Sequence, residues 1–176
     1  VVLLLCVLLL PAQPAQAVDL WQRPDQAAHA QLQRGNTAYR KGDSTGAAPQ
    51  YDALDSPTAH YNRGNALAKA GRYPQAIAAY KEAIAVQDTL PYMEPPYWYY
   101  PVRQSLGAAL LRTGQLDAAE QVFRDSLART PSNGWALRGL IEVYQKRGDA
   151  PALAAARKRF ETTWLGEPGG PPLTRL

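Results

Sequence analysis

Cysteine and histidine are scarce in this sequence, and their scarcity limits its chemistry. Cys6 is the only cysteine among 176 residues, and it lies in an apolar run at the start. The chain therefore forms no internal disulfide, and beyond residue 17 it has neither a cysteine nucleophile nor a thiolate metal ligand. The two histidines, His29 and His60, have no third ligand or carboxylate cluster to complete a metal site. We predict that the protein is not an enzyme and has no catalytic residue, metal site or cofactor.

A hydrophobic run long enough to cross a bilayer is also missing. The first ten residues, VVLLLCVLLL, are about half of the roughly 20 that a membrane-spanning helix needs. The small-x-small sequence Ala15-Gln16-Ala17 follows, which predicts a signal peptide cleaved after Ala17. No initiator methionine or basic region precedes the run, so residues 1–17 also fit the end of a transmembrane helix, and a cytoplasmic protein with an unusual start is a third interpretation. The first two place the rest of the chain in the periplasm, either free or attached to the membrane through residues 1–17.

Strong charge of either sign is lacking as well. The formal net charge is +4, and the acidic residues are spread through the same segments as the basic ones. A protein that follows a phosphate backbone concentrates its cations on one surface. We therefore predict no nucleic-acid partner.

Residues 60–86, HYNRGNALAKAGRYPQAIAAYKEAIAV, have the pattern of two short antiparallel helices. Small residues alternate with large apolar ones, as close and interlocking helix packing requires. Gly71 lies where the first helix must end, since glycine adopts positive φ without steric cost. Pro74 lies near the start of the second helix, where a missing N–H is tolerated. The segment is predicted to be a helical hairpin.

The turn glycine of this hairpin recurs along the chain at Gly42, Gly71, Gly114 and Gly148. Successive glycines are separated by 29, 43 and 34 residues. The last spacing is the length of one two-helix repeat, while the longer one contains a proline-rich and aromatic segment. Four hairpins with one insertion between the second and the third are predicted.

These residues identify a family resemblance. The run Tyr61-Asn62-x-Gly64-Asn65-Ala66-Leu67, followed by the turn at Gly71, resembles the tetratricopeptide repeat (TPR) signature almost position for position, and Leu106-Gly107 with Phe123 matches it again. The resemblance implies an all-α fold, a right-handed α-solenoid of about four TPR helical hairpins. The predicted organisation is a leader at 1–17, a TPR domain at 18–164 with hairpins at about 24–55, 57–87, 102–130 and 134–164, a proline and aromatic insertion at 88–101, and a flexible tail at 165–176.

Narrower resemblances divide the chain into two halves. The N-terminal half, with DLWQRPDQAA and AHYNRGNALAKAGR, resembles the TPR region of the bacterial aerotolerance (Bat) proteins, in which a membrane segment precedes the repeats. The C-terminal half, from PPYWYYPVRQSLGAALLRTG through NGWALRGL, resembles the last repeats of a different group of long bacterial TPR proteins. Both resemblances imply TPR architecture, and they do not imply one common function.

Stacked hairpins of this kind place their first helices on the inner side of a curved groove, which is the expected binding surface. Asparagine amides there would bond an extended peptide backbone, and the cations would hold its carboxylates. Alternatively, a cation near a helix end stabilises the helix dipole and adds solubility. The predicted groove residues for a protein or peptide partner are Asn36, Tyr39, Arg40, Tyr61, Asn62, Asn65, Lys69, Gln104 and Arg112.

Among these, Asn62 matches the asparagine that holds the peptide backbone in peptide-binding TPR modules. Leu32 and Pro101 stand where the two-carboxylate clamp of chaperone-binding TPR domains has lysines. A receptor for chaperone tails is therefore not expected.

The aromatic insertion is a second candidate surface. Trp98 and Tyr99 lie in its run of large aromatic residues, which are common anchors of protein interfaces. Alternatively, the rings fill the gap that the insertion opens between the second and third hairpins.

Together these features predict a non-catalytic interaction scaffold of the bacterial cell envelope that binds a peptide or protein in its groove. The alternatives are a membrane-anchored assembly factor of the aerotolerance type and a self-associating structural module.

Overall fold

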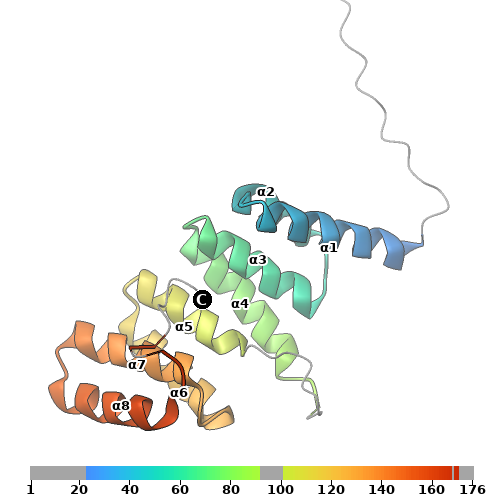
Figure 1. Ribbon diagram of the computed structural model, residues 1–176. Helices are drawn as coiled ribbons and strands as arrows, with labels where there is room; N and C mark the ends of the chain where they lie inside the picture. The colour runs from blue at the N-terminus through green and yellow to red at the C-terminus, as the bar shows by residue number, and fades with distance from the viewer. Residues whose placement is uncertain (1–22, 92–100, 168, 171–176) are drawn as a thin grey trace, which may run out of the picture.

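The structure is a computed structural model that describes residues 23–91, 101–167 and 169–170. Within these ranges the chain forms helices and turns and no strand. Figure 1 shows the helices stacked in sequence order. They are α1 (Pro24–Arg40), α2 (Ser44–Asp52), α3 (Pro57–Lys69), α4 (Tyr73–Gln87), α5 (Val102–Arg112), α6 (Leu116–Arg129), α7 (Gly134–Arg147) and α8 (Ala150–Thr163). The predicted fold class, an all-helical solenoid of four hairpins, is confirmed.

Local sequence determines where the helices begin and end. Ser56 caps α3 by accepting a hydrogen bond from the backbone N–H of Ala59, and Pro57 is the first residue of the helix. The turn glycine Gly71 has φ of +75°, as predicted, and the other three turn glycines are also left-handed. Asn133 caps α7 by accepting hydrogen bonds from the backbone N–H groups of Trp135 and Ala136.

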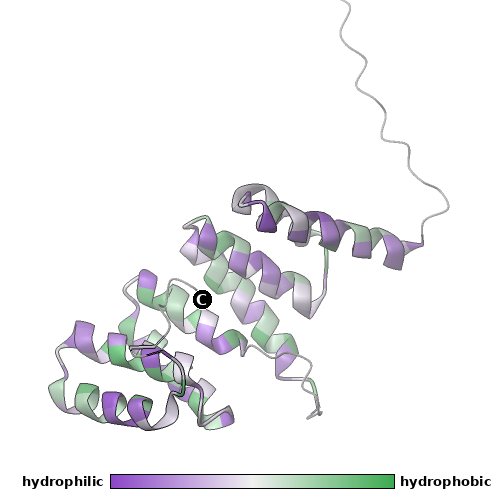
Figure 2. Ribbon diagram, in the orientation of Figure 1, coloured by the Kyte–Doolittle hydropathy of each residue, from purple (hydrophilic) through white to green (hydrophobic). Residues whose placement is uncertain are grey.

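Each helix packs against its neighbours in the chain, and the first helices of successive hairpins also pack together. Thus α3 contacts both α1 and α5, and α5 contacts α7. Successive second helices do not pack on one another in this way within the described ranges. The first helices therefore lie on the inner side of the curve, as the groove prediction requires. Figure 2 shows hydrophilic and hydrophobic residues on every helix, as expected of amphipathic helices.

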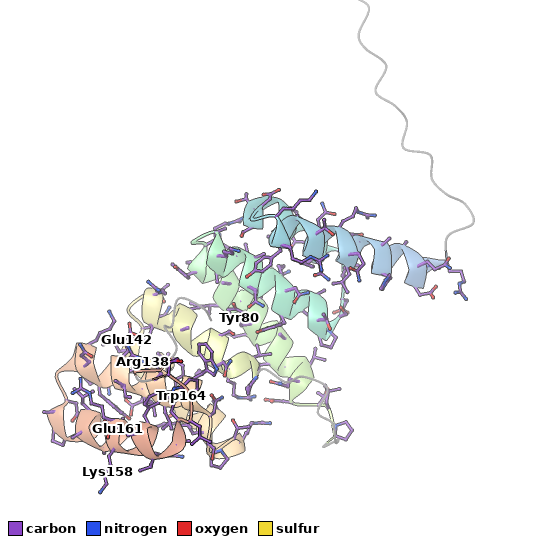
Figure 3. All side chains as sticks on the ribbon, viewed as in Figure 1. Tyr80, Arg138, Glu142, Lys158, Glu161 and Trp164 are labelled. Atoms are coloured by element: carbon purple, nitrogen blue, oxygen red, sulfur yellow. The ribbon has the colours of Figure 1, made fainter. Side chains whose placement is uncertain are left out.

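A glycine on each of the first three first helices allows an aromatic ring of its partner helix to approach the backbone. A methyl group at Gly64 would lie 2.5 Å from Cδ1 and Cε1 of the buried ring of Tyr80, which Figure 3 labels in the middle of the stack. Gly35 stands in the same relation to Tyr51, and Gly107 to Phe123. The fourth hairpin has no glycine at this position, since Ile141 occupies it.

An acidic residue and an arginine join the hairpins at each of the three junctions. Asp52 of the first hairpin pairs with Arg63 of α3 at 3.2 Å. Asp88, just after α4, pairs with Arg103 of α5 at 2.6 Å. At the third junction the acid is Asp117 of α6, which is 2.7 Å from a guanidinium nitrogen of α7. In every case the acid belongs to the earlier hairpin and the arginine to the first helix of the later one.

The third junction is the most extensively bonded of the three. Arg147 of α7 binds Asp117 and also Glu120, and Glu120 further accepts hydrogen bonds from Tyr144 and Arg124. Burial alone would raise the pKa of Glu120, but the hydrogen bonds from Arg147, Arg124 and Tyr144 outweigh it and lower the pKa to about 2. The carboxylate is therefore ionised at any physiological pH and fixes α7 against α6.

The described residues that follow α8 lie against the end of that helix, and the flexible tail at 165–176 stays a prediction. Trp164 stacks on Phe160 with ring centroids 5.7 Å apart, and its indole N–H donates to the carbonyl of Glu167. A methyl group at Gly170 would lie 2.3 Å from the ring of Phe160, so this residue also touches α8. None of the helices in the described ranges combines the length and apolarity that crossing a membrane requires.

Candidate functional site

Two asparagine–tyrosine pairs build the polar site between the first two hairpins. The hydroxyl of Tyr51 on α2 donates to Oδ1 of Asn36 on α1 at 2.9 Å. The hydroxyl of Tyr80 on α4 donates to Oδ1 of Asn65 on α3 at 2.8 Å. Asn65 follows Asn36, and Tyr80 follows Tyr51, by the number of residues that separates Gly42 from Gly71. The pair is therefore a feature of the repeat.

Asn62 connects the two hairpins at this site. Its amide nitrogen donates to Oδ1 of Asn36 at 3.0 Å, so that oxygen accepts two hydrogen bonds. Within the described part of the chain, no hydrogen bond engages the amide nitrogens of Asn36 and Asn65 or the carbonyl oxygen of Asn62. The site therefore offers two donors and one acceptor, the complement of a peptide backbone.

These amides line a pocket of about 180 Å³ where α1, α2 and α3 meet. Five of its six lining residues are predicted site residues, and the sixth, Tyr51, was not predicted as a site residue. The recurrence of tyrosine at the position of Tyr80 could have identified it. The lining residues are Asn36, Tyr39, Arg40, Tyr51, Asn62 and Asn65.

Two cations border this amide pocket. Nζ of Lys69 lies 4.7 Å from the ring centroid of Tyr39, which is a cation–π contact between α3 and α1. Arg40 is exposed at the end of α1, with one guanidinium nitrogen 3.5 Å from the hydroxyl of Thr37. The pocket therefore has a positive rim, which favours a ligand with carboxylates near its bound backbone.

The tyrosine hydroxyls of the site remain protonated donors. Burial is the main cause that raises the pKa of Tyr39, Tyr51 and Tyr80, and nearby tyrosines raise it further. Arg40 lowers the pKa of Tyr51, but by less than burial raises it. Since the phenols stay neutral, the orientation of the asparagine amides is independent of pH in the physiological range.

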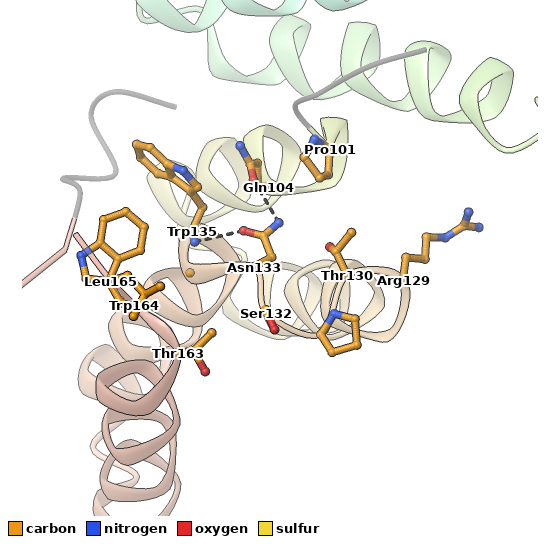
Figure 4. A pocket seen from close by; sticks show the side chains of 12 residues that line it. Pro101, Gln104, Arg129, Thr130, Ser132, Asn133, Trp135, Thr163, Trp164 and Leu165 are labelled. Carbon is orange, nitrogen blue, oxygen red and sulfur yellow. Dashed lines mark hydrogen bonds between the residues drawn. The ribbon is translucent and has the colours of Figure 1, made fainter. Parts of the chain in front are cut away.

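The structure does not bring Gln104 to the amide pocket. Gln104 is only 2% exposed, and its Oε1 accepts a hydrogen bond from Asn133 at 3.1 Å, as Figure 4 shows. It lines a separate open cleft of about 710 Å³ near the start of α5, together with Trp135 and Trp164 (Figure 4). This residue stabilises the α6–α7 connection and is not available to a ligand in the predicted way.

The remaining predicted residues lie in three different settings. Tyr61 is half-buried, with its ring 6.2 Å from that of Tyr80, so it packs against the core. Arg112 is exposed in the last turn of α5, away from the amide pocket. Trp98 and Tyr99 lie outside the described residues.

The third hairpin has lost the polar pair. When the chain is aligned on the turn glycines, Phe123 takes the place of Tyr80, and Ala108 takes the place of Asn65. Both are buried, and Phe123 is fully so. In the part of the chain that the structure describes, the asparagine–tyrosine pair therefore occurs in the first two hairpins.

Elsewhere, His60 lies between two carboxylates, with Nε2 3.1 Å from Asp55 and Nδ1 3.1 Å from Glu82. The other histidine, His29, is exposed on α1. No group of three or more histidine, cysteine or acidic side chains suited to a metal ion occurs among the residues described.

Two segments match models of a known family. Residues 57–89 and residues 101–143 each match a model described as tetratricopeptide repeat. They cover the second hairpin, the whole third hairpin and most of α7 in the fourth. The chain therefore contains tetratricopeptide repeats.

Among curated proteins, the chain is similar to cellulose synthase 1 operon protein C of Komagataeibacter xylinus. The two are 31% identical over 102 residues, which make up 58% of this chain. The match spans 8% of the length of that relative. The similarity thus concerns one part of a much longer protein.

Solved structures of MamA have a similar fold. One crystal structure of MamA superposes with a TM-score of 0.69 at 20% identity, covering 80% of each chain. MamA from Desulfovibrio magneticus RS-1, residue 41 to the end, gives 0.66 at 18% identity, over 77% of this chain and 75% of that one. At such identities the similarity supports the fold alone.

Proposed function

We propose that this tetratricopeptide-repeat protein is a non-catalytic scaffold that holds an extended segment of a partner protein on the side formed by its first helices. The amide pocket grips the backbone of the segment, and Arg40 and Lys69 attract its carboxylates. The two segments that match tetratricopeptide repeats support the general role in protein interaction. The observation that carries the groove assignment is the Asn62–Asn36 hydrogen bond, which leaves two donors and one acceptor unused at the pocket.

A selection of linear peptides tests this proposal. Random peptides displayed on phage are selected on the immobilised full chain, and the best binder is measured by calorimetry against single variants. Asn62→Ala is expected to weaken binding by about tenfold, since it removes one backbone bond and releases Asn36. Lys69→Ala is expected to weaken mainly the peptides with acidic residues.

The matched control lies on the opposite end of the stack. Arg157 is an exposed cation of α8, and Arg157→Ala is expected to leave the affinity unchanged. The groove assignment would be disproved if the selected peptides bound both groove variants as tightly as the original protein. It would also be disproved if the full chain selected no more peptides than an unrelated protein does.

We further propose that the protein acts in the bacterial cell envelope. The apolar run at residues 1–10 and the cleavage sequence Ala15-Gln16-Ala17 support this location, either as an exported protein or as a membrane-anchored one of the aerotolerance type. N-terminal sequencing of the protein from fractionated cells distinguishes these. A mature chain that begins at Val18 in the periplasm indicates export, uncleaved protein in the membrane fraction indicates an anchor, and uncleaved protein in the cytoplasm contradicts both.

A further inference from the structure

Among the described residues, no helix covers the outer side of α1. Its main contacts are with α2 and α3, and it lies at one end of the stack of helices in Figure 1. A shallow depression of about 450 Å³ lies on this face. It is lined by Ala30, Gln33, Arg34, Thr37, Ala38, Lys41 and Asp43, which we call the end face.

Inside the stack, the equivalent positions form the junctions between hairpins. Alignment on the turn glycines places Ala30 at the position of Ala59 and Thr37 at that of Ala66. Both alanines are fully buried in α3, which packs against α2. The end face thus has the small residues of a junction, but no helix of the described ranges covers them as α2 covers α3.

The two cations of the end face also stand at junction positions. Arg34 is equivalent to Arg63, which binds Asp52 of the preceding hairpin. Lys41 is equivalent to Arg147, which binds carboxylates of α6. Within the described part of the chain, neither Arg34 nor Lys41 forms an ion pair.

One carboxylate, that of Asp43, also lines the end face. It is engaged as the cap of α2, where its Oδ1 accepts a hydrogen bond from the backbone N–H of Gly46 at 2.7 Å. Its charge lowers the net positive potential of the face without neutralising both cations. The end face therefore remains cationic beside small residues.

We infer that the end face docks an acidic, alanine-rich amphipathic helix of a partner protein, in the way that the second helix of one hairpin covers the first helix of the next. The three internal junctions define the required chemistry, namely small apolar residues with carboxylates placed opposite Arg34 and Lys41. A second copy of this chain does not supply it. Its free helix, α8, presents the exposed cations Arg157, Lys158 and Arg159, and Figure 3 shows Lys158 directed away from the stack.

The test uses a helix of the required chemistry against the full chain. The probe is a peptide that copies residues 116–129 with Arg124→Asp, so that carboxylates occupy all three junction positions. A hydrocarbon staple between the positions of Gln121 and Asp125, both exposed in the protein, keeps it helical. Fluorescence anisotropy of the labelled peptide gives its affinity.

The expected result is saturable binding that depends on the cations of the end face. Arg34→Glu with Lys41→Glu should weaken binding by about tenfold or more, because both ion pairs become repulsive. The matched control, Arg157→Glu with Lys158→Glu, makes the same charge change on α8 and should have no effect. Equal weakening by both variants would show non-specific charge attraction and overturn the inference.

A charge exchange completes the test. A second peptide carries lysine in place of Asp117, Glu120 and the new aspartate, and it should bind the Arg34→Glu, Lys41→Glu protein better than the original protein. Absence of binding by the acidic peptide up to about 1 mM overturns the inference. The inference is also overturned if the full chain sediments as a dimer and Arg34→Glu dissociates that dimer. The end face would then bind a second copy of this chain.

Discussion

The side-chain amide nitrogen of Asn62 donates a hydrogen bond to Oδ1 of Asn36, which lies 3.0 Å away on the preceding hairpin. The same oxygen accepts a hydrogen bond from Tyr51. One atom therefore connects three helices, α1, α2 and α3, and determines which ends of the neighbouring amides are available to a ligand. The structural role of this oxygen and the proposed binding role of the pocket therefore depend on the same hydrogen bonds.

Removal of that acceptor should destabilise the protein. Asn36→Ala leaves Tyr51 and Asn62 without their partner in a half-buried site, and we expect the free energy of unfolding to fall by about 1–2 kcal/mol. Urea unfolding followed by circular dichroism measures it. Gln33→Ala, an exposed change on the same helix, is the control and should alter stability by less than about 0.5 kcal/mol. An equal effect of both changes would show that the network adds no stability.

The third hairpin has Phe123 and Ala108 where the second has Tyr80 and Asn65, and this difference suggests a double-mutant cycle on Tyr80 and Asn65. Tyr80→Phe should cost about 1 kcal/mol, since Asn65 loses its donor. Tyr80→Phe with Asn65→Ala reproduces the Phe123 and Ala108 arrangement and should recover most of that loss, because no polar atom is then left unpaired. Thermal unfolding of the four proteins measures the coupling. Strictly additive losses would contradict the pairing.

The close approach of Gly64 to Tyr80 predicts a steric effect. Gly64→Ala places a methyl group 2.5 Å from the ring, and overpacking of this kind costs about 1–3 kcal/mol, against about 1 kcal/mol gained in helix propensity. We expect net destabilisation in urea unfolding. With Tyr80→Leu already present the ring is absent, so the same Gly64→Ala change should become stabilising. Destabilisation in both backgrounds would place the cause elsewhere.

The low pKa of Glu120 predicts how stability depends on pH. The folded state lowers this pKa from 4.5 to about 2, so the stabilisation is complete above about pH 4.5 and is lost as the pH falls towards 2. Glu120→Gln should therefore lower stability by about 1–2 kcal/mol at pH 7, and the difference from the original protein should shrink between pH 4.5 and 2. Urea unfolding at a series of pH values measures it. Asp125→Asn, on the same helix, is the control. If it caused a similar pH-dependent difference in stability, the pH dependence could not be assigned to Glu120.

Local rules of the sequence predict the helix ends well. Ser56 with Pro57 and the left-handed Gly71 each act within one turn of the chain, so no distant contact can override them. The helical periodicity likewise predicts that Asn36, Asn62 and Asn65 lie on the groove side of the first helices. The amide pocket was predictable to that extent, because the repeats fix the register of one hairpin against the next.

Contacts across hairpins were not predictable in the same way. Gln104 has the spacing of a groove residue, but α5 packs among α3, α4, α6 and α7, and Asn133 occupies its side chain. The acid and arginine of each junction stand at different repeat positions, so alignment of the repeats does not reveal them. Tyr51 was missed because its hydroxyl reaches the pocket from a second helix.

The order of acid and arginine at the junctions gives every hairpin a direction. The second hairpin meets its predecessor with Arg63 and its successor with Asp88, and the third repeats this polarity. Since the paired residues stand at different repeat positions at each junction, a hairpin copied to another place in the series would not find its acidic and basic partners. The ion pairs therefore favour one order of the hairpins along the stack.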